Sequence, residues 1–391
     1  MSLENIWFFL ALMVGASFAV RALPVLPARL RLPASFAVLL LFLCWAPFVL
    51  DDFRTFQLAR IGVWIVVAMG LNILTGYNGQ ISLGHGALVA LGAYTAAMLM
   101  DETTQMSFVD ATPWPFWLAI IMAGIVTAVV GLFLGIPALR LSGPYLAIAT
   151  LALAISFPPV MRKYEQFTSG SAGIRPPPLQ APGFLDGVIE RMDWLYFVSL
   201  GGTLLMLLLA WALLRGPLGR AFIAVRDSEV AAAAMGVNVA RTKVTAFTIS
   251  AFFAGVSGGL YTQVVGFISP DAITIFQSIN LFAAVVIGGL ASILGSVIGG
   301  AALIFLPSDA PDLVARLPGL DVDVVKRAPG AIQGLIVILT ILMLPTGVAG
   351  AVQRLRHLRP AMVVATLRTM LVSGQLAQRL PWARHDETPS E

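Results

Sequence analysis

The stretch Gly76–Gly86 reads Gly-Tyr-Asn-Gly-Gln-Ile-Ser-Leu-Gly-His-Gly and separates two long apolar runs. Its closely spaced glycines permit an irregular backbone. At membrane depth such a backbone is tolerated only where protein buries it or where it lines a wet cavity. Asn78, Gln80, Ser82 and His85 supply neutral hydrogen-bonding groups. The pattern favours a broken helix that meets a polar substrate, and an ordinary turn between two spans remains open as the alternative.

The composition of the whole chain supports a membrane setting for this stretch. Of 391 residues, 58% are hydrophobic and 11% are charged, and the mean hydropathy is +0.89. A soluble domain carries roughly 25% charged residues. In a bilayer the apolar surface faces lipid and needs no solvation by water. We therefore expect an all-α integral membrane protein with a polytopic helix bundle.

Apolar runs near the length of one bilayer crossing predict about ten or eleven transmembrane helices, some of them broken or re-entrant. The candidate spans are 3–20, 35–50, 57–74, 83–100, 114–139, 142–158, 194–214, 243–265, 273–290, 291–307 and 331–349. The stretch 57–100 reads either as two spans or as one span and a re-entrant piece. The first run is followed by its arginine and not preceded by one, which favours a retained span over a cleaved signal peptide.

The distribution of charge predicts how the spans are oriented. If the C-terminus is cytoplasmic, most of the basic residues lie on the cytoplasmic side, as the positive-inside rule requires. We therefore expect the bacterial inner membrane, an external N-terminus, a periplasmic loop 159–193 and a cytoplasmic loop 215–242. Residues 1–350 form the membrane domain. The basic tail 351–391 contains an apolar stretch that suits an interfacial helix.

Charged groups are missing where ion-coupled transport needs them. The middle of every candidate span lacks Asp, Glu, Lys and Arg, and Arg60 falls near a span end, where its side chain is expected to snorkel to the interface. This argues against a secondary transporter working alone, which stays open as an alternative. The dispersed basic residues indicate membrane topology and no nucleic-acid partner.

Signatures of catalysis are also missing from the sequence. None of the three lysines follows a glycine, so there is no Walker A motif. The three histidines show no metal-site spacing. We expect neither an enzyme nor a resident metal or cofactor, and any ATP hydrolysis must occur on another chain.

The loop 215–242 contains the signals of one short helix. Ser228 is placed to cap a helix that begins near Glu229, and the following alanines favour its propagation. Gly236 is placed to end it. A short helix with small side chains suits docking into a groove on a partner. A solvated connecting helix is the alternative.

Glycines recur in two later runs, Gly255–Gly259 and Gly288–Gly300. Small residues allow transmembrane helices to approach closely, so we expect these glycines to serve helix packing. Gly143 and Pro144 together predict the start of a further helix.

Several of these stretches, in this order, resemble the permeases of the branched-chain amino acid ABC importers, and most of all the longer of the two permease subunits. They are GYNGQISLGHGALVALGAYTAA (Gly76–Ala97), GPYLAIATLALA (Gly143–Ala154), TSGSAGI (Thr168–Ile174), Gly219–Tyr261 and FAAVVIGGLASILGSVIGG (Phe282–Gly300). The resemblance runs from residue 57 to residue 350.

The resemblance implies partners and a cargo. A second homologous permease subunit, two ATP-binding cassette ATPase subunits that use the ATP, and a periplasmic substrate-binding protein are expected. Leucine, isoleucine and valine are the expected cargo. Relatives of this type are also associated with urea, short-chain amides and aromatic acids, and no residue of the sequence separates these cargoes.

The resemblance also implies two sets of site residues. The substrate path is expected at Tyr77, Asn78, Gly79, Gln80, Ser82, Gly84, His85 and Gly86. Coupling to the ATPase is expected at Arg226, Glu229, Ala231, Ala232 and Gly236. The chain reads Glu229-Val230-Ala231 where the general importer pattern has Glu-Ala-Ala, and this departure bears on which ATPase is the partner.

Overall fold

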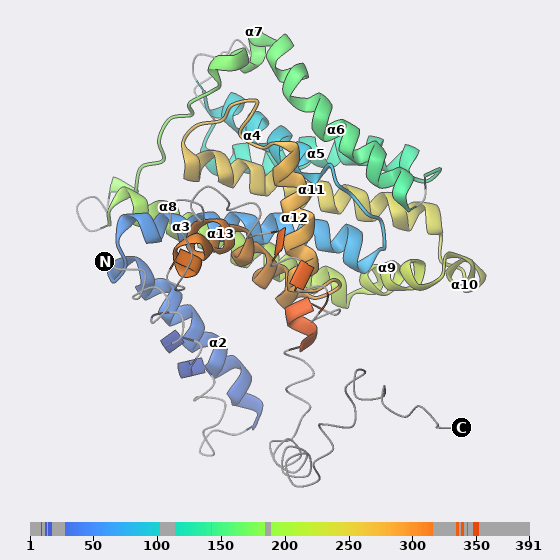
Figure 1. Ribbon diagram of the computed structural model, residues 1–391, viewed down its shortest axis with the longest axis horizontal. Coiled ribbons are helices and arrows are strands. Elements are labelled where there is room, and N and C mark those ends of the chain that lie inside the picture. Colours follow the sequence, from blue (N-terminus) through green and yellow to red (C-terminus); the bar gives the residue numbers. More distant parts are fainter. Residues whose placement is uncertain are drawn as a thin grey trace, which may run out of the picture.

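The computed structural model describes residues 28–101, 114–141, 143–183 and 189–315, with isolated residues between 9 and 17 and between 334 and 351. Within these ranges the chain is helical, and the β-type pairing is a single antiparallel bridge between Ile174 and Ile268. The helices that cross or edge the bundle are α2 (Ala28–Trp45), α3 (Asp52–Leu71), α4 (His85–Met100), α5 (Phe116–Ala138), α6 (Pro144–Lys163), α8 (Arg191–Arg215), α11 (Val239–Val265), α12 (Ile275–Gly288) and α13 (Ile293–Ala315) (Figure 1). The shorter helices are η1 (Ala46–Phe48), η2 (Asn72–Tyr77), α7 (Glu165–Thr168), η3 (Gly170–Ala172), α9 (Pro217–Asp227) and α10 (Glu229–Ala234).

The helices confirm the all-α, polytopic fold. Five of the described helices are long and apolar enough to cross a bilayer, and four shorter apolar helices accompany them. Each candidate span between residues 35 and 307 coincides with one of these helices. The candidates 3–20 and 331–349 fall mostly outside the described residues, and so does nearly all of the tail 351–391.

Two long helices lie at the centre of the bundle, and most residues of the shorter α4 are buried with them. In their most apolar stretches, 89% of the residues of α3 with its continuation η2 and 72% of those of α11 are buried, against 39% in α5, 28% in α6 and 22% in α8. The outer helices carry large exposed apolar side chains such as Phe133, Ile148 and Leu205. Such side chains are stable at a surface that faces lipid. The chain is therefore a bundle with a buried α3–α11 axis and an apolar outer layer.

Glycines set the distance between α4 and α11, as the sequence predicts. A Cβ atom on Gly92 would lie 2.5 Å from the Cα atom of Gly255. Gly258 packs in the same way against the backbone of Val89. Any larger residue would force the two helices apart.

The structure corrects the two predicted loops. Helix α6 continues through Pro158 and Pro159 to Lys163, beyond the predicted loop start at 159, and α7 and η3 follow it. Segment 215–242 contains α9 in addition to the predicted helix. Pro217 opens α9, and its Phe222 and Val225 are buried against the bundle, so the segment has an amphipathic helix that the sequence prediction lacks. Helices α9 and α10 lie together at one end of the bundle (Figure 1).

Candidate translocation and coupling sites

Helix α3 does not end in a regular α-turn. Its last residues, Asn72–Tyr77, form the π-helical turn η2, in which the amide of Asn78 donates to the carbonyl of Ile73 at 3.2 Å. Gly79 has φ +78°, and the chain then runs without regular structure until α4 begins at His85. The stretch 57–100 is thus a long helix, a segment without regular structure at residues 78–84, and a short helix. We call the segment 78–84 the irregular return. The irregular backbone expected from the glycine pattern is present.

The irregular return leads from one end of the bundle into its interior. The carbonyl of Gly76 accepts a hydrogen bond from Arg226 of α9, at the end that carries α9 and α10. His85 lies beside Gly70, with its Nε2 atom 3.4 Å from where a Cβ of Gly70 would stand. Gly70 precedes Gly76 along α3 by about 9 Å. Helix α4 therefore starts inside the bundle.

Side chains from other helices accept hydrogen bonds from the backbone amides of the irregular return and of the first turn of α4. The amide of Leu83 donates to Thr150 Oγ1 of α6 at 3.0 Å, and that of Gly86 donates to Ser278 Oγ of α12 at 3.2 Å. These hydroxyls satisfy backbone groups that a broken helix leaves without a partner. Gly84 packs directly on the backbone of Thr150, which leaves no room for a side chain.

The polar side chains of the return are buried and largely unpaired. Asn78 is 2% exposed and His85 is 0% exposed. Neither amide atom of Asn78, neither ring nitrogen of His85, nor the hydroxyl of Ser82 has a hydrogen-bond partner among the described residues. Gln80 has one partner, because its Nε2 donates to the carbonyl of Lys243 at 3.1 Å while its Oε1 has none. Buried polar groups without partners cost free energy, so their concentration here indicates a functional segment.

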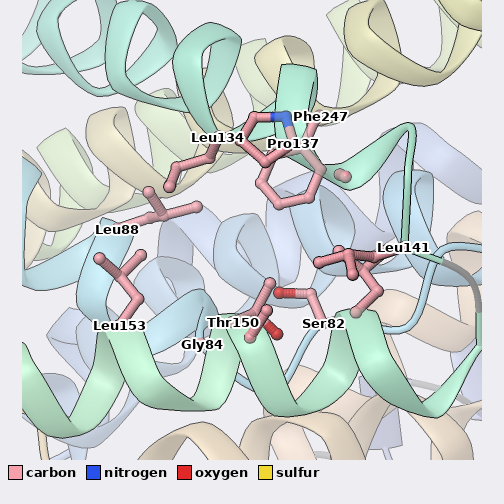
Figure 2. A pocket seen from close by; sticks show the side chains of 12 residues that line it. Ser82, Gly84, Leu88, Leu134, Pro137, Leu141, Thr150, Leu153 and Phe247 are labelled. Carbon is pink, nitrogen blue, oxygen red and sulfur yellow. The ribbon is translucent and has the colours of Figure 1, made fainter.

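A small cavity of about 80 Å³ adjoins the return. Figure 2 shows Ser82 and Thr150 on one side of it, beneath apolar side chains that include Leu88, Leu134 and Phe247. This volume accommodates waters, which need roughly 10–15 Å³ each by this measure. Of the predicted path residues, Ser82 and Gly84 line this cavity. Tyr77 is partly exposed at the end of η2, and Gly79 packs against Arg226.

The predicted path residues therefore form one continuous, mostly buried segment and, in the part of the chain that the structure describes, do not surround one open channel. Helices α3, α6, α11 and α12 enclose the segment.

Asn72 is a buried polar residue that joins two distant segments, and the sequence motifs do not include it. It is fully buried, and its amide group donates to Ser292 O at 2.9 Å and to Ser296 Oγ at 2.8 Å. Its Oδ1 accepts from the amide of Ala291 at 2.8 Å. One side chain thus joins the π-turn of α3 to the turn between α12 and α13. A lone Asn inside an otherwise apolar span was the available signal.

The segment 215–242, which we call the coupling segment, contains α10, and this helix has the caps predicted for it. Ser228 Oγ accepts a hydrogen bond from the amide of Ala231 at the start of α10, and Gly236 has φ +85° just after its end. Ala232 is buried against the bundle, whereas Ala231 is exposed. Val230 and Met235 are 83% and 85% exposed. Helix α10 therefore rests on the bundle through one face and presents two apolar side chains outward.

Two basic residues connect the coupling segment to the irregular return. Arg226 Nη1 donates to Gly76 O at 3.0 Å. Lys243 pairs through Nζ with Glu229 of α10 at 2.6 Å, and its own carbonyl accepts from Gln80. The side chains of Arg226 and Lys243 are 34% and 12% exposed, so both contacts lie partly inside the protein. The two predicted residue sets are therefore physically connected.

Known proteins resemble the chain over the same region. Residues 54–344 match the family described as branched-chain amino acid transport system / permease component. The high-affinity branched-chain amino acid transport system permease protein LivM of Salmonella typhimurium is 34% identical over 277 residues, 66% of this chain and 63% of its own length. LivM of Escherichia coli is 34% identical over 278 residues, with the same two shares.

A second type of permease protein also matches. The high-affinity branched-chain amino acid transport system permease protein LivH of Escherichia coli is 28% identical over 300 residues, 73% of this chain and 91% of its own length. This chain spans 63% of the length of the LivM relatives. No solved structure matches the chain significantly. The match over residues 54–344 shows that the chain belongs to the family of permease components of branched-chain amino acid transport systems.

Proposed function

We propose that this chain is the transmembrane permease subunit of an ATP-driven importer and forms part of the path for leucine, isoleucine and valine. The observation that carries the proposal is the connection between the coupling segment and the buried polar return through Arg226 and Lys243. A permease that another chain drives needs such a link between its docking surface and its substrate path. The family match supports the same function.

The partners follow from the same proposal. The chain is similar to both LivM and LivH, two differently named permease proteins of one transport system, which supports pairing with a second homologous permease. The greater similarity to LivM supports the role of the longer subunit. Two ATPase subunits dock at α9 and α10, where the exposed Val230 and Met235 offer an apolar contact. A periplasmic binding protein delivers the cargo at the opposite end.

The proposed docking of the ATPases implies an orientation and a location for the chain. The end with α9 and α10 faces the cytoplasm, so the chain lies in the bacterial inner membrane. Arg215, Arg220, Arg226, Arg241 and Lys243 gather in the segment at this end, which agrees with the positive-inside rule. The chain itself is not catalytic, and ATP is bound and hydrolysed by the partner subunits.

The mechanism is alternating access. ATP binding moves the ATPases and, with them, α10. The contacts of Arg226 with Gly76 and of Lys243 with Gln80 pass the motion to the irregular return and so to α3 and α11. When the helices separate, the unpaired groups of Asn78, Ser82 and His85 can bind the polar groups of a passing cargo. Few charges line this segment, which suits weak binding and rapid release.

Uptake of labelled leucine by cells with and without the chain tests the function. We expect deletion to abolish binding-protein-dependent leucine uptake and a plasmid copy to restore it. Urea and benzoate serve as parallel cargoes, because urea carries no carboxylate and benzoate is an aromatic acid. Unchanged leucine uptake with loss of urea or benzoate uptake would refute the proposed cargo. Uptake by the purified chain without ATPase subunits would refute the ATP-driven mechanism.

A further inference from the structure

A larger cavity lies in the half of the bundle away from α9 and α10. It has a volume of about 450 Å³ and lies between the first turns of α3, the outer half of α12 and the second half of α13. Its polar lining comes from Gln57, Arg60, Gln277, Asn280 and Ser308. Its apolar lining includes Phe56 and Ile304. The volume falls in the range of about 300–1,000 Å³ that is typical of small-molecule sites.

Arg60 does not occupy the position expected from the sequence. Helix α3 begins at Asp52 and, with η2, continues to Tyr77, so it is longer at its start than the candidate span 57–74. Arg60 therefore lies about 12 Å along this helix. It lines the cavity, and its guanidinium carbon lies over the ring of Phe56, one turn nearer the start of the helix. Arg60 is therefore a charged side chain that lines the cavity about two turns after the start of α3, and its snorkelling to the interface stays a prediction.

Arg60 also lacks an anionic partner in the described part of the chain. Its Nε atom is buried without a hydrogen bond, and among the described residues no carboxylate forms an ion pair with it. Its guanidinium carbon lies 5.7 Å from the centroid of the Phe56 ring. Its neighbour Arg54, by contrast, donates to Gln57 Oε1 at 2.6 Å. Charged side chains within membrane spans are costly and usually mark a ligand or ion pathway.

The remaining lining residues complement a small zwitterion with an apolar side chain. A guanidinium binds a carboxylate through two parallel hydrogen bonds. The side chains of Gln277 and Asn280, one helical turn apart on α12, make no hydrogen bond to a described residue. Their amide groups are free to bind polar ligand atoms, and Phe56 and Ile304 provide a surface for an aliphatic chain.

We propose that this cavity is a cargo site at the entry side of the permease, in which Arg60 binds the carboxylate of the transported amino acid. The inference rests on the proposed function and narrows its cargo to molecules that carry a carboxylate. Urea and simple amides offer Arg60 no anion. A lipid headgroup carries a phosphate oxyanion of similar chemistry, and the experiment separates these two sources.

The test is equilibrium binding to the assembled transporter in nanodiscs, without the binding protein. Saturation-transfer NMR with leucine and with leucinamide, which lacks the carboxylate, reports weak binding directly. We expect leucine to bind the wild type and Arg60→Gln to weaken its binding about tenfold or more. Arg60→Lys keeps the charge but cannot form two parallel hydrogen bonds to a carboxylate. Its affinity for leucine should therefore lie between those of the wild type and Arg60→Gln. Leucinamide should bind weakly to all three proteins.

Arg191→Gln is the matched control, because Arg191 is exposed at the first residue of α8 and does not line the cavity. It should bind leucine like the wild type. Equal leucine binding by Arg60→Gln and the wild type would overturn the proposal. So would a parallel loss of leucine and leucinamide binding in Arg60→Gln, which indicates a structural role.

Lipid composition and a second cargo complete the test. Leucine binding that persists in pure phosphatidylcholine nanodiscs supports the cargo site. Stabilisation by phosphatidylglycerol that requires Arg60, without leucine binding, assigns the cavity to lipid and refutes the proposal. If the wild type binds benzoate through Arg60 but neither binds nor transports leucine, the proposed cargo fails while the carboxylate site stands.

Discussion

Arg226→Ala is expected to lower leucine uptake while the assembled transporter continues to hydrolyse ATP. The guanidinium of Arg226 donates a hydrogen bond to Gly76 O and so joins α9 directly to η2. Coupling between sites in proteins typically corresponds to a factor of roughly 5–150, and we expect the loss to fall in that range. The measurement is leucine uptake and ATP hydrolysis by the same proteoliposomes.

The same substitution should leave the fold intact. The side chain of Arg226 is 34% exposed and its other partner, Asp227, is 61% exposed, so solvent weakens both interactions. Removal of the guanidinium should therefore lower the free energy of unfolding by only about 1 kcal/mol. Arg220→Ala is the control, because Arg220 is exposed on the same helix and its side chain, among the described residues, hydrogen-bonds only to the carbonyl of Arg215 at 3.4 Å. Uptake and hydrolysis that fall together in Arg226→Ala, or that fall equally in Arg220→Ala, would contradict the assignment.

Asn72→Ala should lower the free energy of unfolding more than Arg226→Ala does. The substitution removes the bonds to Ser292 O, Ser296 Oγ and the amide of Ala291 and opens a space at a fully buried position, and it leaves the amide of Ala291 without a partner among the described residues, whereas Ser296 Oγ keeps its bond to Ser292 O. We expect the free energy of unfolding to fall by about 2–5 kcal/mol, because each buried group without a partner costs about 1–3 kcal/mol. The unfolding temperature of the purified transporter in detergent measures the effect.

Asn280→Ala provides a stability control of the same residue type. Asn280 is partly exposed on α12 and makes no hydrogen bond to a described residue, so its removal should shift the unfolding temperature little. Equal shifts for the two variants would show that the Asn72 network does not hold η2 against the α12–α13 turn.

Local sequence signals predicted most of the helices and their caps. Long apolar runs located the helices because a span must satisfy its backbone bonds within itself. Ser228 and Gly236 were predicted as caps because capping depends on a few neighbouring residues. The packing of Gly92 on Gly255 was predictable in kind, since small residues alone permit close helix contact.

Features that depend on distant contacts were not predictable in the same way. Helix α9 was not predicted because its apolar face matters only once Phe222 and Val225 meet the bundle. The role of Asn72 depends on groups more than 200 positions away in the sequence. The distance of Arg60 from the helix start depends on where α3 begins, and apolar runs define such boundaries poorly.

The candidate site contains features that local sequence predicts and features that depend on distant contacts. The glycines of the irregular return predicted its broken backbone, and Gly79 indeed adopts φ +78°. Its burial beneath α6 and α12, through Thr150 and Ser278, follows from tertiary contacts that the pattern does not contain. The role of these residues in transport remains a prediction.

A reversible crosslink across the Arg226–Gly79 contact tests the central claim most directly. A Cβ atom on Gly79 would lie 3.5 Å from Cβ of Arg226, within the usual range of about 3.5–4.5 Å for a disulfide. The chain has one native cysteine, Cys44, so Gly79→Cys/Arg226→Cys is made together with Cys44→Ser. Gly79→Cys alone controls for backbone strain at φ +78°.

The quantity to measure is leucine transported per ATP hydrolysed, in the reduced and the oxidised transporter. If motion passes from α9 to the irregular return at this contact, the reduced double variant hydrolyses ATP with little uptake, and oxidation restores the ratio toward that of the Gly79→Cys control. A ratio that stays low after the crosslink has formed, or that is already normal in the reduced protein, would contradict transmission of the motion through this contact.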